Sequence, residues 1–204
     1  VNRPILESRL KDRLKKSNLK NLSDYYKILI AEPQELKVLL DAVTTNLTSF
    51  FRNSVQFYAL ENEVVNQLIA SKDEKVVRVW SAGCSTGEEP YTLAMVLKEF
   101  SQINAVRLPF TVLATDISTN VLEKARLAVY DKEQISPVPH VMKSKYLLKN
   151  KDPQNKVYRI IPELRETVSF RRLNFMDGEF GFRESMDIIF CRNVLIYFDK
   201  PTRD

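Results

Sequence analysis

Glycine, cysteine and histidine are scarce in this sequence of 204 residues, which contains four glycines, two cysteines and one histidine. Cys84 and Cys191 are far apart in the chain, which indicates free thiols in a reducing compartment rather than a disulfide framework. So few cysteines and histidines cannot supply a metal cluster at the usual ligand spacings, and we predict no metal site. A serine protease-like triad would depend wholly on His140, which lies between prolines and a charged helix pattern and reads as a loop residue.

Long apolar runs are also missing. The run of about 18 or more apolar residues that a transmembrane helix needs is absent, and the first residues, VNRPILESRLKDRLKK, lack the apolar core of a secretory signal. We therefore expect a cytoplasmic protein. With 44% apolar and 28% charged residues, the chain can bury a core and form one or two domains.

The net charge of +5 is concentrated at the start of the chain. Residues 1–30 contain eight basic and three acidic side chains, whereas the remainder contains 23 of each sign. Such a face is often only solvated surface, but it also fits docking of an acidic partner, either protein or nucleic acid.

Residues 1–72 are expected to form a helical domain. An apolar stripe runs through ILESRLKDRLKK, a cap signal at Ser23 opens SDYYKILI, and Pro33 suits the first turn of PQELKVLLDAV. A polar turn with Asn46 and Thr48 then leads into an aromatic-rich amphipathic helix.

The pattern changes after the short connector SKDEK. Four runs rich in β-branched and aromatic residues follow, and helical patterns come after the first two: VVRVWSA, FTVLATDI, VSFRRLNF and MDIIFCRNVLIYF. Alternating strands and helices predict a parallel sheet covered by helices on both faces, so residues 73–204 are expected to be an α/β domain.

The loop between the first strand and the next helix, AGCSTGEEP, contains Gly83 and Gly87. Glycines here let a ligand approach the backbone closely, although they could also simply turn the chain. The second strand ends at Asp116, the place from which an acid can bind both hydroxyls of a ribose. Together the two features indicate a nucleoside cofactor.

The charge of the loop bears on which cofactor it is. Glu88 and Glu89 at the helix start would repel the pyrophosphate of a dinucleotide, and neither Gly-x-Gly-x-x-Gly nor Gly-Lys-Ser/Thr is present. S-adenosylmethionine has no phosphate and carries positive groups, so it fits an acidic loop. Whichever glutamate does not face the ligand could simply complement the helix dipole.

Four segments together resemble the chemotaxis receptor methyltransferases of the CheR type: TTNLTSFFRN, WSAGCSTGEEPYTLA, ATDISTNVLEKAR and IIFCRNVLIYFDKPT. The resemblance implies an α/β fold, with a Rossmann-like S-adenosylmethionine methyltransferase domain preceded by a small all-α domain. It also implies a small antiparallel β insertion at about residues 143–163. The family's sheet has seven strands, and four are recognised here, so the C-terminal strands are expected to be missing.

The resemblance also implies the site residues. Arg52 and Tyr197 would line the site of methyl transfer. Cofactor contacts are expected from Asn46, Thr48, Arg52, Gly83, Glu88, Glu89, Asp116, Asn174, Phe175, Arg192 and Asn193. Of the two glutamates, Glu89 is favoured for the amino-acid end of the cofactor, whereas Asn174 and Phe175 would flank the adenine.

Such enzymes esterify receptor glutamates. A glutamate side chain is already an ionised nucleophile at neutral pH, so no general base is needed and the reaction does not require a histidine. Arg52 could hold either the incoming carboxylate or the carboxylate of the cofactor, and the sequence does not separate these roles.

The expected partners are the cytoplasmic helices of chemotaxis receptors, bound through basic residues such as Arg9, Arg13 and Lys16. No nucleic acid, no membrane insertion and a monomer are expected. In some relatives the β insertion captures a receptor tail by adding a strand. Here its loop KNKDPQNK lacks glycine, which leaves tail binding open.

Three other classes stay open: a nucleic-acid methyltransferase, a non-catalytic cofactor-binding regulator and a nicotinamide oxidoreductase. The first would suit the basic pI, but the place of its usual motif reads CRNVLIYF. The second would not need Arg52 and Tyr197.

Overall fold

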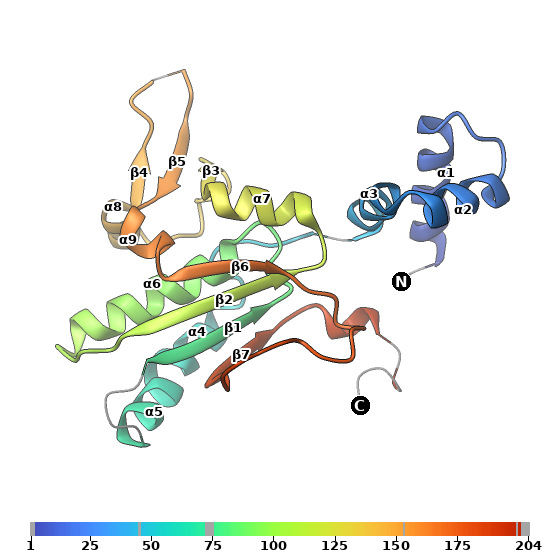
Figure 1. Ribbon diagram of the computed structural model, residues 1–204. Coiled ribbons are helices and arrows are strands. Elements are labelled where there is room, and N and C mark those ends of the chain that lie inside the picture. The colour runs from blue at the N-terminus through green and yellow to red at the C-terminus, as the bar shows by residue number, and fades with distance from the viewer. Residues whose placement is uncertain (1–2, 45, 72–75, 153, 199, 201–204) are drawn as a thin grey trace.

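The computed structural model describes residues 3–44, 46–71, 76–152, 154–198 and 200. Three helices, α1 (Arg3–Lys16), α2 (Leu22–Ala31) and α3 (Pro33–Val43), stand together to one side of the remaining chain (Figure 1). Pro33 occupies the first turn of α3, as predicted. The predicted cap at Ser23 is wrong, because the N-cap of α2 lies two residues earlier, at Asn21, which accepts a hydrogen bond from the backbone N–H of Asp24.

A half-buried ion pair holds these three helices together. The guanidinium of Arg13 on α1 donates to both carboxylate oxygens of Glu35 on α3, at 2.6 and 2.8 Å. The hydroxyl of Tyr25 on α2 donates to the same carboxylate at 2.7 Å. Because only 16% of the Arg13 side chain is exposed, the prediction that Arg13 belongs to a free docking face is corrected.

The next helical run is α4 (Ser54–Ala59), a π-helical turn (Leu60–Val64) and α5 (Val65–Ser71). Its buried side chains Phe57, Leu60 and Val65 share one core with the strands. The predicted domain boundary at residue 72 stays a prediction, and this packing favours a division between α3 and α4.

The main sheet contains β1 (Val77–Ala82), β2 (Phe110–Asp116), β6 (Val168–Arg172) and β7 (Ile188–Cys191), all parallel, in the order β6-β2-β1-β7. The predicted parallel sheet is therefore confirmed. The chain moves outward from β1 through β2 to β6 and then returns to the other side of β1. This reversal creates a crevice at the carboxyl ends of β1 and β7, where open α/β sheets bind ligands.

The two faces of the sheet are covered differently. Alternate residues such as Val79 and Val112 point into the core made with α4, α5 and α6 (Glu88–Ile103). Trp80 and Leu173 on the other face pack against aromatic residues of the segment after β6, including Phe175 and Phe182. The prediction of helices on both faces is thus wrong for this face, as far as the described residues go.

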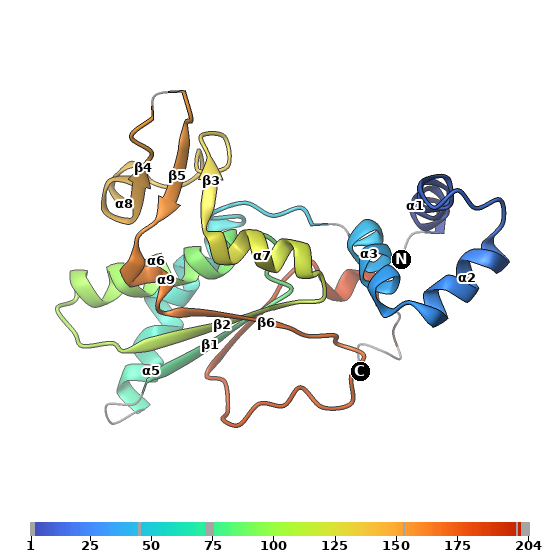
Figure 2. The same cartoon turned by 45° about the horizontal axis from the view of Figure 1, so that its top comes forward.

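A small antiparallel sheet of order β3-β5-β4 stands above the main sheet in Figures 1 and 2. Its strands are β3 (Val129–Asp131), β4 (Leu147–Lys149) and β5 (Val157–Ile160). The predicted hairpin corresponds to β4 and β5, but residues 143–146 belong to helix α8 (His140–Tyr146). The helices α7 (Thr119–Leu127) and α9 (Pro162–Arg165) join this sheet to β2 and β6, and a short 3-10 helix, Leu195–Tyr197, follows β7.

Candidate cofactor and methyl-transfer site

The glycine loop after β1 needs its glycines for two physical reasons. Both Gly83 and Gly87 have left-handed φ angles, of 81° and 98°. A Cβ at position 83 would lie 2.3 Å from a methyl carbon of Val194, so a side chain cannot fit unless the Val194 side chain moves. The backbone N–H groups of Gly83 and Cys84 both donate to the carbonyl of Thr115, which fixes the loop against β2.

Asp116 at the end of β2 holds the loop from the other side. Its two carboxylate oxygens accept hydrogen bonds from the backbone N–H groups of Ser85, at 2.9 Å, and Ser118, at 3.0 Å. Burial raises the pKa of Asp116, and these hydrogen bonds oppose the rise. Each carboxylate oxygen retains a lone pair, so Asp116 is able to accept further hydrogen bonds from a diol in the crevice.

Glu89, in the first turn of α6, is the acid that faces the crevice, and 14% of its side chain is exposed. It accepts a hydrogen bond from the hydroxyl of Ser81 at 2.8 Å and lies 3.6 Å from a nitrogen of Arg192. Burial raises its pKa to about 6, although Ser81, Arg192 and Arg52 each lower it. A further positive group on a ligand would stabilise this carboxylate.

Glu88 is directed elsewhere. One carboxylate oxygen accepts from the hydroxyl of Thr86 at 2.6 Å, and the other lies 3.4 Å from the side-chain nitrogen of Gln134, next to the small sheet. Glu88 does not line the cavity described below. Its predicted cofactor contact is therefore corrected to a structural role at the start of α6.

Arg192 ties the loop before α4 to the site. Its guanidinium donates to the backbone carbonyl of Arg52, lies beside Glu89 and covers the ring of Phe57 at 5.3 Å. The Arg52 side chain itself donates to the carbonyl of Leu47 at 2.8 Å. Phe51 has a left-handed φ of 52°, and such strained residues are commonly found at functional sites.

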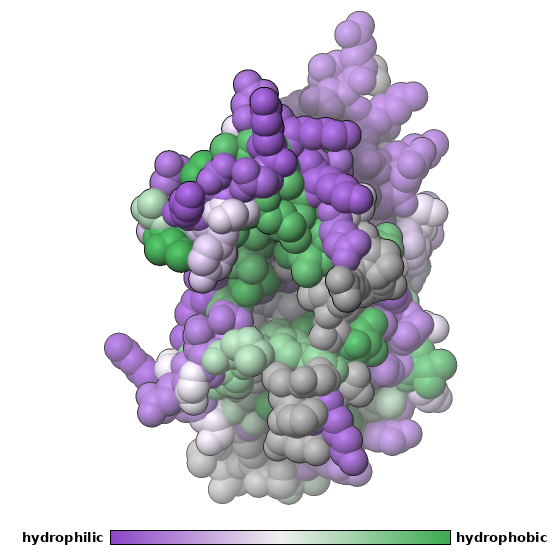
Figure 3. Space-filling model, turned by 90° about the vertical axis from the view of Figure 1, so that its right-hand side faces the viewer, coloured by the Kyte–Doolittle hydropathy of each residue, from purple (hydrophilic) through white to green (hydrophobic). Residues whose placement is uncertain are grey.

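These groups surround a cavity of about 640 Å³ between α3 and the carboxyl ends of the strands. Figure 3, which views the molecule from the side of α1 to α3, shows hydrophobic side chains gathered around a hollow. The volume lies within the range of roughly 300 to 1,000 Å³ that is usual for cofactor sites.

All the predicted cofactor residues except Glu88 line this cavity. The side chain of Asn174 bonds Met176 and Asp177, which shapes the turn beside Phe175. The side chain of Tyr197 lies outside the described residues, so its role stays a prediction.

Sequence reasoning missed one wall of the cavity. This wall consists of Leu36, Leu40 and Val43, which recur at helical spacing along α3. That periodicity was visible in the sequence, but it could not show that the stripe faces the sheet domain.

The geometry suits S-adenosylmethionine. The crevice offers an acid for a ribose and an acid with a raised pKa for an ammonium group, whereas the glutamates of the loop disfavour a phosphate. A parallel sheet with a switch point beside β1 and this set of acids favours the class of S-adenosylmethionine-dependent methyltransferases.

The chain belongs to the CheR methyltransferase family. Residues 46–204 match the family model of the CheR methyltransferase S-adenosylmethionine binding domain, and residues 1–44 match that of its all-alpha domain. S-adenosylmethionine is therefore the methyl donor.

Curated relatives align with almost the whole chain. A chemotaxis protein methyltransferase of Borreliella burgdorferi is 42% identical over 205 residues, covering 98% of this chain and 71% of the relative. Chemotaxis protein methyltransferase 2 of Pseudomonas aeruginosa is 38% identical, with 98% and 69% covered. The chemotaxis protein methyltransferase of Salmonella typhimurium is 34% identical, with 99% and 68% covered. Among the described residues, no helix is long and apolar enough to cross a membrane.

Proposed function

We propose that the protein transfers methyl groups from S-adenosylmethionine to glutamate side chains of chemotaxis receptors and so forms glutamate methyl esters. When bound, the cofactor supplies an electrophilic methyl group on a sulfonium. Asp116 and Glu89 hold its ribose and its amino group, and the remaining task of the chain is to align the acceptor carboxylate. Such alignment alone is worth roughly 7 to 11 kcal/mol in well-oriented reactions.

The observation that carries this proposal concerns the salt-bridge partners of Arg52. Arg52 lines the cavity and forms no salt bridge among the described residues. It lowers the pKa of Glu89 at longer range, whereas the carboxylate of Glu89 is paired with Arg192. A guanidinium without a carboxylate partner at such a site favours an anionic acceptor. The single histidine, His140, is exposed at the start of α8, so it supplies no general base here, and a carboxylate acceptor needs none.

The test is a labelled-methyl assay with receptor fragments, followed by measurement of base-labile methanol release. Arg52→Gln is expected to lower the rate by about a hundredfold, because the acceptor carboxylate loses a group that positions it for attack. If Arg52 holds the acceptor, affinity for S-adenosylhomocysteine stays within a few-fold; if it holds the cofactor, both properties fall.

Arg183→Gln serves as the control, since Arg183 is exposed and lies outside the cavity. Label that appears in a base-stable form on nucleic acid would contradict the proposal. Cofactor binding without methylation of any receptor would instead indicate a regulator.

Receptor docking is assigned to the helical domain. Arg9 and Lys16 are exposed on α1, and Leu22, Tyr26 and Ile30 form an exposed stripe at i, i+4 and i+8 on α2. An exposed apolar stripe and exposed basic residues within one helical domain suit an amphipathic acidic helix.

Replacing Arg9 and Lys16 by Glu is expected to raise KM for the receptor about tenfold and to spare S-adenosylhomocysteine binding. Lys132→Glu, an exposed change on the other domain, is the control. An unchanged KM would place docking elsewhere. We further propose that the protein is a cytoplasmic monomer that binds neither nucleic acid nor membrane.

A further inference from the structure

The turn that carries Arg52 has an unusual backbone. The residues on either side of Arg52, Phe51 and Asn53, both have left-handed φ angles, of 52° and 56°. A bulky residue such as Phe51 rarely adopts this conformation, and it does so only where surrounding contacts hold it there. The place of Arg52 at the cofactor cavity therefore depends on what holds this turn.

The turn is held by contacts from three directions. The ring of Phe50 is fully buried in the core of the sheet domain. The guanidinium of Arg192 donates to the backbone carbonyl of Arg52. The backbone N–H of Phe51 donates to the hydroxyl of Thr92 on α6 at 3.2 Å. Of these contacts, the one made by Thr92 acts directly on the backbone of the strained residue.

Thr92 lies outside the lining of the cofactor cavity but joins two parts of the site. It is fully buried, and its hydroxyl donates to the backbone carbonyl of Glu88, one helical turn earlier, at 2.7 Å. A hydroxyl that donates one hydrogen bond can still accept another, and this one accepts from Phe51. The same oxygen therefore links the turn of Arg52 to the helix start that carries Glu89.

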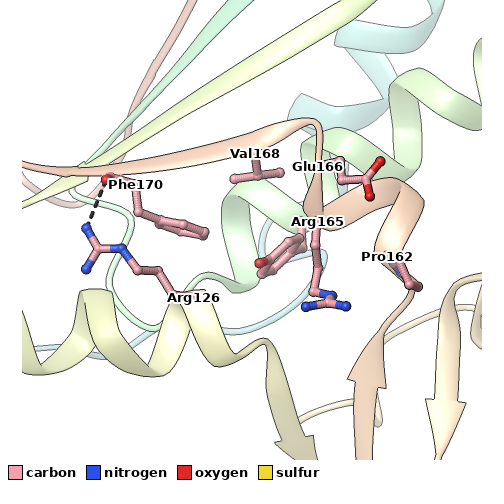
Figure 4. A pocket seen from close by; sticks show the side chains of 7 residues that line it. Arg126, Pro162, Arg165, Glu166, Val168 and Phe170 are labelled. Carbon is pink, nitrogen blue, oxygen red and sulfur yellow. Dashed lines mark hydrogen bonds between the residues drawn. The ribbon is translucent and has the colours of Figure 1, made fainter.

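The neighbouring residue of α6 faces another part of the molecule. Adjacent residues of a helix point about 100° apart. Tyr91 accordingly lines a separate cavity of about 290 Å³, which Figure 4 shows beside α9 and β6. None of the residues that line this cavity lines the cofactor cavity. The hydroxyl of Tyr91 is also buried, but it donates to the carbonyl of Ala125 at 3.0 Å. Tyr91 and Thr92 are thus two buried hydroxyls of one helix with different partners.

We propose that Thr92 is a positioning residue for methyl transfer, because its hydroxyl holds Phe51 in the left-handed conformation that places the Arg52 guanidinium at the cavity. The inference rests on the proposed function, since it takes Arg52 as a group of the methyl-transfer site. Without the hydroxyl, the N–H of Phe51 loses its acceptor and the turn relaxes. A small displacement of an aligning group is sufficient to slow a reaction that depends on alignment.

The test uses Thr92→Val, which removes the hydroxyl and keeps the shape of the side chain. Its kcat/KM for receptor fragments is expected to fall about tenfold, and the loss should divide between kcat and KM as it does in Arg52→Gln. Thr92→Ser retains the hydroxyl and should restore the rate to within a few-fold of the wild type. Tyr91→Phe is the matched control and should leave kcat and KM unchanged. Thr92→Ala replaces Thr92→Val if S-adenosylhomocysteine binding shows that the latter is unfolded.

A double-mutant cycle shows whether Thr92 acts through Arg52. Thr92→Val is expected to change the rate by less than about twofold when Arg52→Gln is already present. Additive losses, an equally slow Thr92→Ser, or an unchanged rate in Thr92→Val while Arg52→Gln is slow would overturn the inference and leave the proposed function intact. A full rate in Arg52→Gln itself would overturn both.

Hydrogen exchange of the Phe51 amide gives a measurement that does not depend on methylation. This amide should exchange about tenfold faster in Thr92→Val than in the wild type, and Tyr91→Phe should leave its exchange unchanged. Equal exchange in Thr92→Val and the wild type would show that the hydroxyl does not hold the turn, whatever substrate the enzyme methylates.

Discussion

The glycine loop with Asp116 and the three-helix region α1 to α3 are held together in opposite ways. Around the loop, backbone N–H groups and buried carboxylates bond one another, and a single added carbon would clash. In the helical region one half-buried ion pair joins the helices, and leucine, tyrosine and isoleucine side chains of α2 remain exposed. The loop is thus built for a fixed ligand, and the helices leave a surface for a partner.

The largest effect is expected from Gly83→Ala, because this change alters the rigid glycine loop. The alanine Cβ would meet Val194 at 2.3 Å in a backbone conformation that disfavours side chains. We expect a loss of about 2 to 3 kcal/mol in S-adenosylhomocysteine binding, or about a hundredfold, measured by calorimetry.

Gly178→Ala is the control for this change, since a Cβ there meets no atom within 4 Å and the backbone is not left-handed. It should leave binding unchanged. If both variants bind equally well, the loop is not rigid.

Glu89 gives a smaller effect with a defined pH dependence. The carboxylate has a raised pKa of about 6, and its charged form is the one that attracts the amino group of the cofactor. Affinity for S-adenosylhomocysteine should therefore be full above pH 6 and should fall, by up to tenfold per pH unit, as the pH decreases through that value.

Glu89→Gln should lower affinity about tenfold at pH 8 and abolish this pH dependence. The stability of the free protein should instead rise as the pH falls from about 6 toward 4.5. In this range the folded state binds more protons than the unfolded state, because the pKa of Glu89 is raised only in the folded state. Glu88→Gln is the matched control and should retain the pH dependence. A pH profile that survives in Glu89→Gln would contradict the role of Glu89.

The smallest effect is expected in the three-helix region α1 to α3, from Glu35→Gln. This change removes the charge that binds Arg13 and Tyr25 and should cost about 1 kcal/mol of stability in α1 to α3. Hydrogen exchange of these helices measures it, and Asp12→Asn, an exposed change on α1, is the control.

Burial opposes the shift, but the hydrogen bonds of Arg13 and Tyr25 outweigh it and lower the pKa of Glu35. Its contribution is therefore present above the ordinary glutamate pKa of about 4.3 and is lost as the pH falls through the lowered value. Equal exchange in Glu35→Gln and wild type would show that another contact joins the helices.

The same difference explains how much the sequence could predict. Strands β1 and β2 and the loop between them were predictable, because parallel strands are continuous apolar runs and the glycines mark a required conformation. The three-residue strand β3 gave no such pattern.

The division of roles between Glu88 and Glu89 was only partly predictable. Adjacent residues on a helix point about 100° apart, so the residue at which α6 begins decides which of them faces the cavity. The pairing of Arg13 with Glu35 could likewise not be predicted, because the two residues are 22 positions apart in the sequence.

The most direct test of the central claim is a crystal structure of the protein with S-adenosylhomocysteine. The account predicts ribose hydroxyls on the Asp116 carboxylate and the cofactor amino group at Glu89. A cofactor bound away from Asp116, or a pyrophosphate-bearing ligand seated on the loop at residues 83–87, would contradict it.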